Sequence, residues 1–255
     1  MADRRADPRH HSALAGHRAR LIALAFAVLA TAAGATPICS DQVFEDSRFT
    51  VCPFDSRHEA LRLVWKDEHG HALRGFAGLA PRHVRFAMNA GMYQQDGTPL
   101  GLYVEDGKRL RPLNLRDAAG GNFYMKPNGV FSVKPNGAMR IEPSDEFALR
   151  SDTPRWATQS GPLLVIGGKL HPQITEDGPS KNLRNGVGLR DARHAYFVIS
   201  DDPVSFGKLA RLFRGRLGCP DALYFDGGVS SAWIPSRHRL DDAVPLGPMV
   251  IVSDR

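Results

Sequence analysis

Short runs of apolar, β-branched and aromatic residues recur along most of this chain, with glycine- or proline-containing turns between them. The runs are Leu61–Trp65, Val84–Met88, Leu100–Val104, Gly129–Val133, Met139–Glu142, Leu163–Ile166, Tyr196–Ile199, Ala222–Phe225 and Met249–Val252. Runs of this length between turn residues predict β-strands. Asp106-Gly107, Asn128-Gly129 and Asn136-Gly137 lie in the turns, and these residue types tolerate left-handed backbone conformations. The chain is therefore predicted to consist mostly of strands and turns.

One segment has the pattern of a helix instead. Asp202 is predicted to cap it, Pro203 suits its first turn, and Gly218 ends it. The residues on its apolar face are Phe206, Leu209, Ala210, Phe213 and Leu217. Because this helix lies between the runs Tyr196–Ile199 and Ala222–Phe225, the order predicts one βαβ crossover with parallel strands near the C-terminus. The predicted fold class is α+β, with mixed twisted β-sheets and a few flanking helices.

The N-terminal region has the features of an export signal. Its arginines, Arg4, Arg5, Arg9, Arg18 and Arg20, precede an uncharged run from Leu21 to Ala33 and the small residues Ala33-Gly34-Ala35. We predict a removable signal peptide at residues 1–35 and a single domain at residues 36–255. The run is shorter than the roughly 20 apolar residues that span a bilayer, so no stable membrane anchor is expected after cleavage. The predicted location is periplasmic or secreted.

The charge of the remaining chain is small. Removal of residues 1–35 takes five arginines and two acids from totals of 33 basic and 27 acidic residues, so the formal net charge falls from +6 to +3. No stripe of lysine and arginine interleaved with aromatics occurs, which argues against nucleic acid as a partner. The expected partner is a small-molecule or glycan substrate, and the sequence does not indicate an oligomeric state.

The cysteines are consistent with an oxidising compartment. We predict a disulfide between Cys39 and Cys52, which would tie the start of the domain to a strand at Phe49–Phe54. Sequence alone does not determine the pairing. With that pairing, Cys219 remains as a buried free thiol.

The run Ala222–Phe225 ends on Asp226, which Gly227 and Gly228 follow directly. A buried strand that stops at an acid and turns through glycines presents one charge at the strand end, beside backbone N–H groups. The crossover would bring Ser200-Asp201 to the same edge, where ligands of α/β sheets bind. The alternative is an ordinary Asp-Gly hairpin turn in which Asp226 only caps the turn.

Three further motifs accompany this one in a fixed order. They are Asn89-Ala90-Gly91-Met92-Tyr93, Gln159-Ser160-Gly161-Pro162-Leu163-Leu164 and Arg184-Asn185-Gly186-Val187-Gly188, before Leu223-Tyr224-Phe225-Asp226-Gly227-Gly228-Val229-Ser230. Together they resemble the phosphodiester glycosidase family, which has bacterial members associated with exopolysaccharide biosynthesis. The resemblance implies hydrolysis of a glycosyl-1-phosphodiester to a sugar and a phosphomonoester. It implies catalytic roles for Asp226 and Arg184 and substrate-binding roles for Asn89, Gly91, Ser160, Gly161, Gly227, Gly228 and Ser230. Relatives often carry glycine in place of Ala90 and Val229, and either side chain here would narrow the pocket.

The chemistry explains why one acid and one guanidinium suffice. A phosphomonoester is a good leaving group that hardly needs protonation, and a second carboxylate would repel the phosphodiester. Arg184 offers paired donors that match phosphate oxygens, and Asp226 is expected to face the anomeric carbon. The N–H groups of Gly227-Gly228 and Ser160-Gly161, with the Ser230 hydroxyl, would complete an anion site. Direct attack by Asp226 and activation of water both remain open.

Other interpretations remain beside this one. As structural alternatives to these assignments, Arg184 would pair with an acid such as Asp191 and Asn89 would hold a loop by bonding its own backbone. A purely structural envelope component would have an occluded pocket, with Arg184 paired internally. A non-catalytic periplasmic binding protein for phosphorylated glycans is the main alternative function. No cofactor or metal is expected, because the histidines are scattered and no His-Glu-x-x-His motif occurs. A divalent cation held by Asp201, Asp202 or Asp226 remains an alternative.

Overall fold

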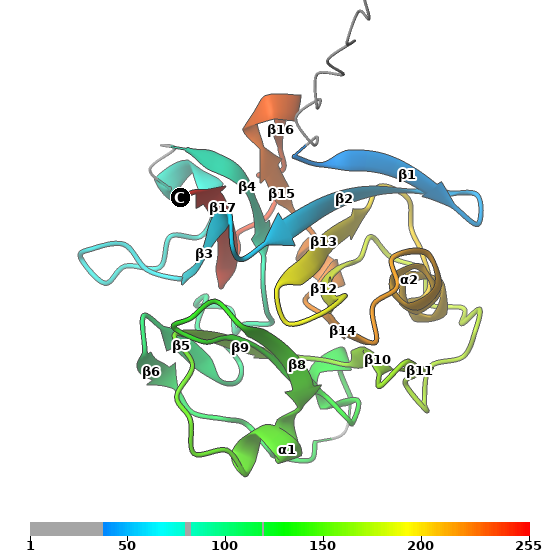
Figure 1. Cartoon of the computed structure of the whole chain (residues 1–255), viewed down its shortest axis with the longest axis horizontal. Helices are drawn as coiled ribbons and strands as arrows, with labels where there is room; N and C mark the ends of the chain where they lie inside the picture. The colour runs from blue at the N-terminus through cyan, green and yellow to red at the C-terminus, as the bar shows by residue number, and fades with distance from the viewer. Residues whose placement is uncertain (1–37, 80–82, 119) are drawn as a thin grey trace, which may run out of the picture. The chain divides into compact units, whose positions relative to one another are not determined.

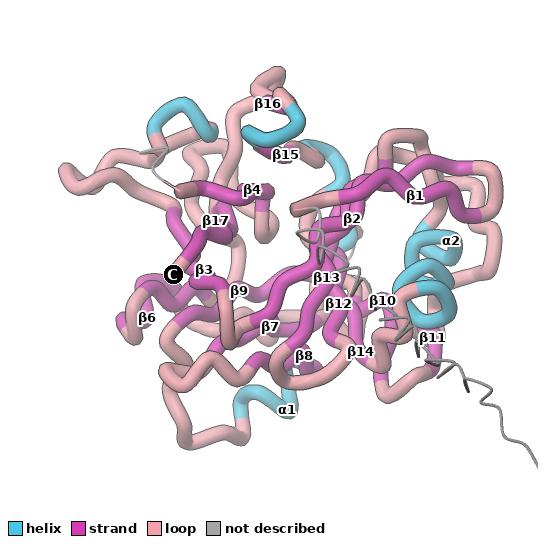
Figure 2. The backbone as a smooth tube through the Cα atoms, turned by 45° about the horizontal axis from the view of Figure 1, so that its top comes forward, coloured by secondary structure: helices cyan, strands magenta, loops and turns pink. Residues whose placement is uncertain are grey.

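The computed structural model describes residues 38–79, 83–118 and 120–255, so the predicted signal peptide lies outside the described residues. The described chain forms three β-sheets with few helices (Figures 1 and 2). Each run that we predicted to be a strand contributes a strand to one of these sheets, although in Leu100–Val104 the strand starts only at Tyr103. The α+β class is confirmed. The sheets are not mixed, because every pair of neighbouring strands described in them is antiparallel.

The sheets contain seven, five and five strands. The first has the order β1 (Ser40–Phe44), β2 (Ser47–Asp55), β13 (His194–Ser200), β12 (Asn185–Leu189), β14 (Asp221–Tyr224), β10 (Leu163–Ile166) and β11 (Lys169–Leu170). The second has the order β16 (Arg239–Leu240), β15 (Ala232–Ile234), β4 (Val84–Asn89), β17 (Met249–Asp254) and β3 (Glu59–Val64). The third has the order β6 (Lys108–Arg111), β5 (Tyr103–Glu105), β9 (Trp156–Ser160), β7 (Gly129–Val133) and β8 (Met139–Pro143).

The helical segments are short. The α-helices are α1 (Ser144–Ala148) and α2 (Phe206–Arg211), and α2 continues as a π-helical turn at Leu212–Arg216. Single 3₁₀ turns occur at Phe76–Gly78, Asn122–Tyr124, Gly227–Val229 and Pro235–Arg237. Within the described residues, none of the helices has the length and apolar character needed to cross a bilayer.

The predicted crossover is present, with one strand inserted. Strands β13 and β14 both run antiparallel to β12, so they are parallel to each other but are not neighbours. The inserted strand has the sequence Asn-Gly-Val-Gly-Leu, which lacks the apolar run of the other strands. Its glycines allow close packing, because a Cβ on Gly186 would lie 2.5 Å from the carbonyl oxygen of Leu223.

The main core lies where the three sheets meet, and the ring of Phe197 on β13 is at its centre. Ring centroids lie 5.4 Å away for Phe86 of the second sheet and 6.0 Å away for Phe131 of the third. Phe54 and Phe225 complete the cluster, and their ring centroids lie 6.3 and 6.5 Å from that of Phe197. Since side chains alternate along a strand, the neighbouring residue on β13, Val198, faces away and packs in the cluster that α2 covers.

The start of α2 differs from the prediction. The Ser205 hydroxyl accepts the Lys208 N–H and is the N-cap, whereas the Asp202 carboxylate accepts the backbone N–H of Arg48 at 2.8 Å. The cap assignment to Asp202 is therefore wrong, because the hairpin of β1 and β2 competes for its carboxylate. Gly218 has φ +65° and follows the end of the helical segment, as predicted.

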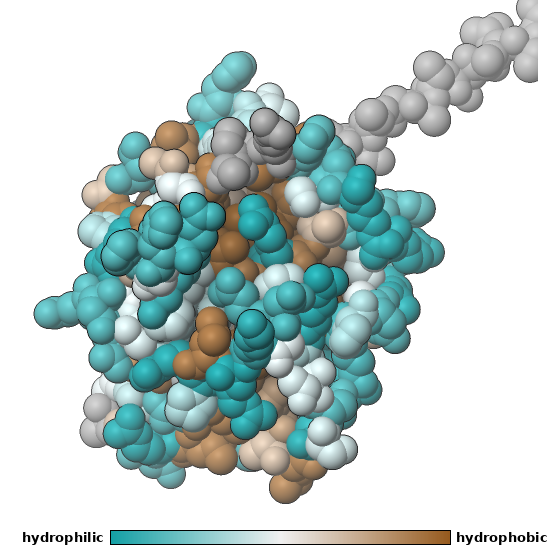
Figure 3. All heavy atoms as spheres, turned by 90° about the vertical axis from the view of Figure 1, so that its left-hand side faces the viewer, coloured by the Kyte–Doolittle hydropathy of each residue, from teal (hydrophilic) through white to brown (hydrophobic). Residues whose placement is uncertain are grey.

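The predicted disulfide between Cys39 and Cys52 is present, and both residues are buried in the main core. Cys219 is a buried free thiol, and burial raises its pKa to about 12. Over the face shown in Figure 3, hydrophilic side chains separate small apolar patches.

Candidate active site

Two buried asparagines fix the main chain of Asp226. Asn89, at the end of β4, donates from Nδ2 to the carbonyl oxygen of Asp226 at 3.0 Å. Asn185, at the start of β12, accepts the N–H of Asp226 on Oδ1 at 3.2 Å and donates from Nδ2 to the Asn89 side chain at 2.8 Å. Both side chains are completely buried. Asn89 therefore binds protein here, and Asn185, which the sequence analysis did not select, holds the other side of the same residue.

The turn after Asp226 uses its own N–H groups. The Asp226 carboxylate accepts the Gly228 N–H at 3.2 Å, and the Tyr224 hydroxyl accepts the Gly227 N–H. A Cβ on Gly227 would lie 2.6 Å from the carbonyl oxygen of Leu183, so the turn requires glycine at this position. Neither N–H is a free donor for an anion in this structure.

Asp226 is the half-buried acid of this turn. Burial raises its pKa to about 6, and the hydrogen bond from the Gly228 N–H opposes the rise. No ion pair to this carboxylate is formed by the described residues. A carboxylate with a pKa near neutrality can exchange a proton or attack carbon at physiological pH.

Arg184 lies directly behind this turn and is 1 % exposed. Its Nε donates to the carbonyl oxygen of Val204 at 2.8 Å and its Nη2 to that of Ser180 at 3.0 Å. The guanidinium carbon lies 3.6 Å from the ring centroid of Phe206 and 5.5 Å from that of Tyr224. Burial lowers the pKa of Arg184, and Tyr224 opposes that shift. Arg184 thus contacts the Asp226 turn through Tyr224, and Asp191, its suggested alternative partner, pairs with His194 instead.

The other predicted positions lie at or just after the ends of β9 and β4. Ser160 is completely buried and donates its hydroxyl to the carbonyl oxygen of Phe225. Gly91 has φ +153°, and a Cβ there would lie 2.7 Å from the Thr158 hydroxyl. A Cβ on Gly161 would lie 2.6 Å from the Cβ of Asn128. Ser160 therefore contacts the main chain just before Asp226, whereas the close contacts of Gly91 and Gly161 are with Thr158 and Asn128.

Ser230 lies on the accessible side. Its half-buried hydroxyl is 3.4 Å from both the Asn185 side-chain oxygen and the Asp226 carbonyl oxygen.

Tyr93, which follows β4, was not predicted to contribute. Its phenol donates to the carbonyl oxygen of Pro245. Burial raises the pKa of Tyr93, the charge of Asp226 raises it further, and Arg74 opposes both.

A pocket of about 490 Å³ opens beside the Asp226 turn. It is lined by Leu183, Gly227, Gly228, Val229, Ser230, Ser231, Arg239, Leu240, Asp241, Asp242, Ala243 and Val244. Of the two departures from the family pattern, Val229 lines this pocket, whereas Ala90 is completely buried in the main core. Only Val229 therefore narrows the pocket.

Two of the acids named for the alternative cation site form ion pairs with different arginines. Asp201 pairs with Arg239 at 2.7 Å, and Asp202 pairs with Arg48 at 3.4 Å. Among the residues that the structure describes, no three His, Cys, Asp or Glu side chains converge in a way that could hold a metal ion.

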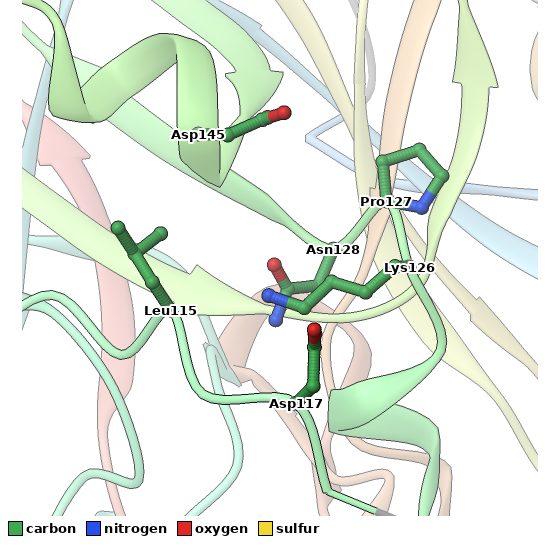
Figure 4. Close-up of a pocket in the computed structure, with 6 residues that line it drawn as sticks. All are labelled: Leu115, Asp117, Lys126, Pro127, Asn128 and Asp145. Carbon is green, nitrogen blue, oxygen red and sulfur yellow. The ribbon is translucent and has the colours of Figure 1, made fainter.

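A second pocket, of about 450 Å³, lies elsewhere and is lined by Leu115, Asp117, Lys126, Pro127, Asn128 and Asp145 (Figure 4). The side chains of Asp117, Lys126 and Asn128 extend toward the same space in this view. None of the predicted catalytic or substrate-binding residues lines it. It therefore provides a location for control substitutions.

Comparison with known proteins agrees with the motifs. Uncharacterized protein YigE of Escherichia coli strain K12 is 32 % identical over 220 residues, which cover 84 % of each chain. The zebrafish N-acetylglucosamine-1-phosphodiester α-N-acetylglucosaminidase catalytic domain, auto-inhibited by its pro-peptide, has a similar fold with a TM-score of 0.57. That match has 14 % identity and covers 87 % of this chain and 85 % of the zebrafish chain.

A protein from Burkholderia pseudomallei also shares the fold, with a TM-score of 0.51 and 11 % identity over 81 % of this chain and 74 % of its own. At such identities the solved structures establish the fold alone. The family match is more direct, since residues 82–252 match the family described as phosphodiester glycosidase. This chain therefore belongs to the phosphodiester glycosidase family.

Proposed function

We propose that this protein hydrolyses a glycosyl-1-phosphodiester in the periplasm or outside the cell, releasing the sugar and a phosphomonoester. The observation that carries the proposal is Asp226, a half-buried carboxylate that has no ion-pair partner among the described residues and whose main chain Asn89 and Asn185 hold on both sides. Its pKa of about 6 and the adjoining pocket suit a reacting carboxylate. The disulfide supports an oxidising compartment.

In the proposed reaction the bond between the anomeric carbon and the phosphate oxygen breaks. Its electron pair leaves with the phosphomonoester, which needs little help from an acid. The Asp226 carboxylate either attacks the anomeric carbon, to form an ester that water then hydrolyses, or accepts a proton from the water that attacks. Both routes require an ionised carboxylate, and both use one acid.

We assign the predicted residues to two groups. Ser230, Gly227 and Gly228 line the pocket, and the Ser230 hydroxyl is a donor for a phosphate or sugar oxygen. Asn89 and Ser160 hold the main chain of Asp226 and Phe225 behind it, and Gly91 and Gly161 allow close packing next to these two residues. Arg184 acts through Tyr224, because its Nε and Nη2 donate to carbonyl oxygens and its guanidinium packs against the rings of Phe206 and Tyr224. We therefore propose Arg184 as a positioning residue rather than a phosphate ligand.

The test is incubation of the purified protein with a panel of sugar-1-phosphodiesters and measurement of released sugar. We expect Asp226→Asn to lower the rate at least about 100-fold. Asp117→Asn, in the pocket of Figure 4, is the matched control and should retain the wild-type rate.

Two results would contradict the proposal. One is equal release by the wild type and Asp226→Asn. The other is tight binding of a diester without turnover by the wild type, with affinity retained in Asp226→Ala, which is the behaviour of the alternative binding protein.

A further inference from the structure

Exposed aliphatic side chains gather at the pocket beside the Asp226 turn. Leu183 is 42 % exposed, Leu240 49 % and Val244 36 %, and all three line that pocket. They come from two segments that are distant in sequence: the residue before Arg184, and strand β16 with the loop that follows it. Single exposed leucines are common on protein surfaces, but their convergence around one cavity indicates a binding surface.

This apolar wall is continuous with the turn. The carbonyl oxygen of Leu183 packs against Gly227, where a Cβ would lie only 2.6 Å away. Val229, two residues further along the turn, lines the same pocket and also packs partly against buried residues. A ligand group that extends from the Asp226 turn into the pocket therefore meets aliphatic carbon on several sides.

The charges of the pocket disfavour an anion in this part. Arg239 is its one cationic lining residue among those described, and it pairs with Asp201 at 2.7 Å and with Asp241 at 2.9 Å. Asp242 is exposed and forms no ion pair with another described residue. An additional phosphate or carboxylate on the ligand would meet an uncompensated acid.

We infer that the pocket formed by Leu183, Val229, Leu240 and Val244 binds an apolar, uncharged aglycone, an alkyl or aryl group carried on the phosphate of the substrate. The inference rests on the proposed function, because the aglycone is defined by that reaction. Each methylene that the pocket buries completely should increase affinity up to about fourfold.

The experiment uses methyl, butyl and hexyl phosphate, which are products of the proposed reaction, as calorimetric probes of the intact protein. We expect the dissociation constant to fall at least about tenfold from methyl to hexyl. Leu240→Ser and Leu183→Ser should each reduce this decrease of the dissociation constant with chain length. Leu149→Ser, at a residue that is 88 % exposed beside α1 and outside the pocket, is the matched control and should keep the wild-type series.

The same chains are then tested as glucose-1-phosphodiesters and N-acetylglucosamine-1-phosphodiesters for sugar release. Two results would overturn the inference: equal affinity for methyl, butyl and hexyl phosphate, or the same dependence of affinity on chain length in the wild type and in both pocket variants. If affinity rises with chain length and the pocket variants remove the rise while no diester is cleaved, the pocket is an apolar binding site and the proposed function fails. If diesters are cleaved with the same KM for methyl and hexyl groups, and the dissociation constants of the alkyl phosphates do not change with chain length, the proposed function stands and the inference about the aglycone fails.

Discussion

The Asn89 side chain donates a hydrogen bond of 3.0 Å to the backbone carbonyl oxygen of Asp226, across 137 positions of sequence. The contact joins the end of β4 in one sheet to the end of β14 in another. Asn89 also accepts the N–H of Ser231 at 2.9 Å, so one amide holds both ends of the Asp226 turn. The geometry of the site thus depends on the packing of two sheets.

Removal of this amide should weaken both the fold and the site. We expect Asn89→Ala to lower the free energy of unfolding by about 2–4 kcal/mol, because the Asp226 carbonyl oxygen and the Ser231 N–H lose their partner in the Asn89 side chain and the Asn185 amide loses one of its two acceptors. Urea denaturation measures the change. Asn136→Ala, in an exposed turn, is the control and should change it by less than about 1 kcal/mol. Equal effects of the two variants would contradict the role given to Asn89.

The pKa of Asp226 predicts the pH dependence of the rate. The carboxylate is the reactive form in the proposed reaction, and its pKa is about 6. We therefore expect kcat/KM to rise as the pH increases and to reach half of its plateau near pH 6. A rate profile on a diester that is chemically stable from pH 4 to pH 8 tests this. A rate that falls across that range would identify the protonated acid as the active form.

The same shift makes Asp226 costly for stability at neutral pH. Its folded-state pKa lies above the ordinary value of 3.8, so the folded protein binds more protons than the unfolded chain between these values. Stability from this group is present below about pH 4 and is lost as the pH rises to about 6. Asp226→Asn should therefore be more stable than the wild type at pH 7 by about 1–3 kcal/mol, and the difference should disappear near pH 4. Denaturant titrations at both pH values measure it.

Arg184→Lys distinguishes positioning from phosphate binding. Lysine cannot place two separate donors on the carbonyl oxygens of Ser180 and Val204, so we expect a loss of about 1–3 kcal/mol of stability. Because Arg184 is proposed to act through Tyr224, Arg184→Lys should lower kcat and leave KM nearly unchanged. Tyr224→Phe should have the same effect. A large rise in KM with an unchanged kcat would indicate direct contact between Arg184 and the substrate.

The disulfide should stabilise the domain measurably. The cysteines are 13 residues apart, and a loop of that size corresponds to about 3 kcal/mol in the chain-entropy description. The Cys39→Ser, Cys52→Ser double variant should lose about 2–4 kcal/mol in urea denaturation. Cys219→Ser, at the free thiol, provides the comparison for removal of a cysteine without loss of the bridge.

Local sequence determined the strands with strong apolar runs, the end of the helix at Gly218, and the order of the family motifs. These features depend on side-chain alternation and turn residues within a few positions of each other. It also placed the acid of the candidate site at the end of β14. The strand β12 was not predicted, because its glycines allow close contacts with β14 and with the π-helical turn after α2 and do not form a local pattern.

Tertiary structure alone decided what the polar side chains of the motifs do. Arg184 is buried against Phe206 and Tyr224, and Asn89 and Asn185 hold the main chain of Asp226. The sequence marks these residues but does not reveal whether their donors meet protein or ligand. Hydrogen-bond partners come from segments up to 142 positions apart, and burial, which sets the pKa of Asp226, exists only once the sheets have packed.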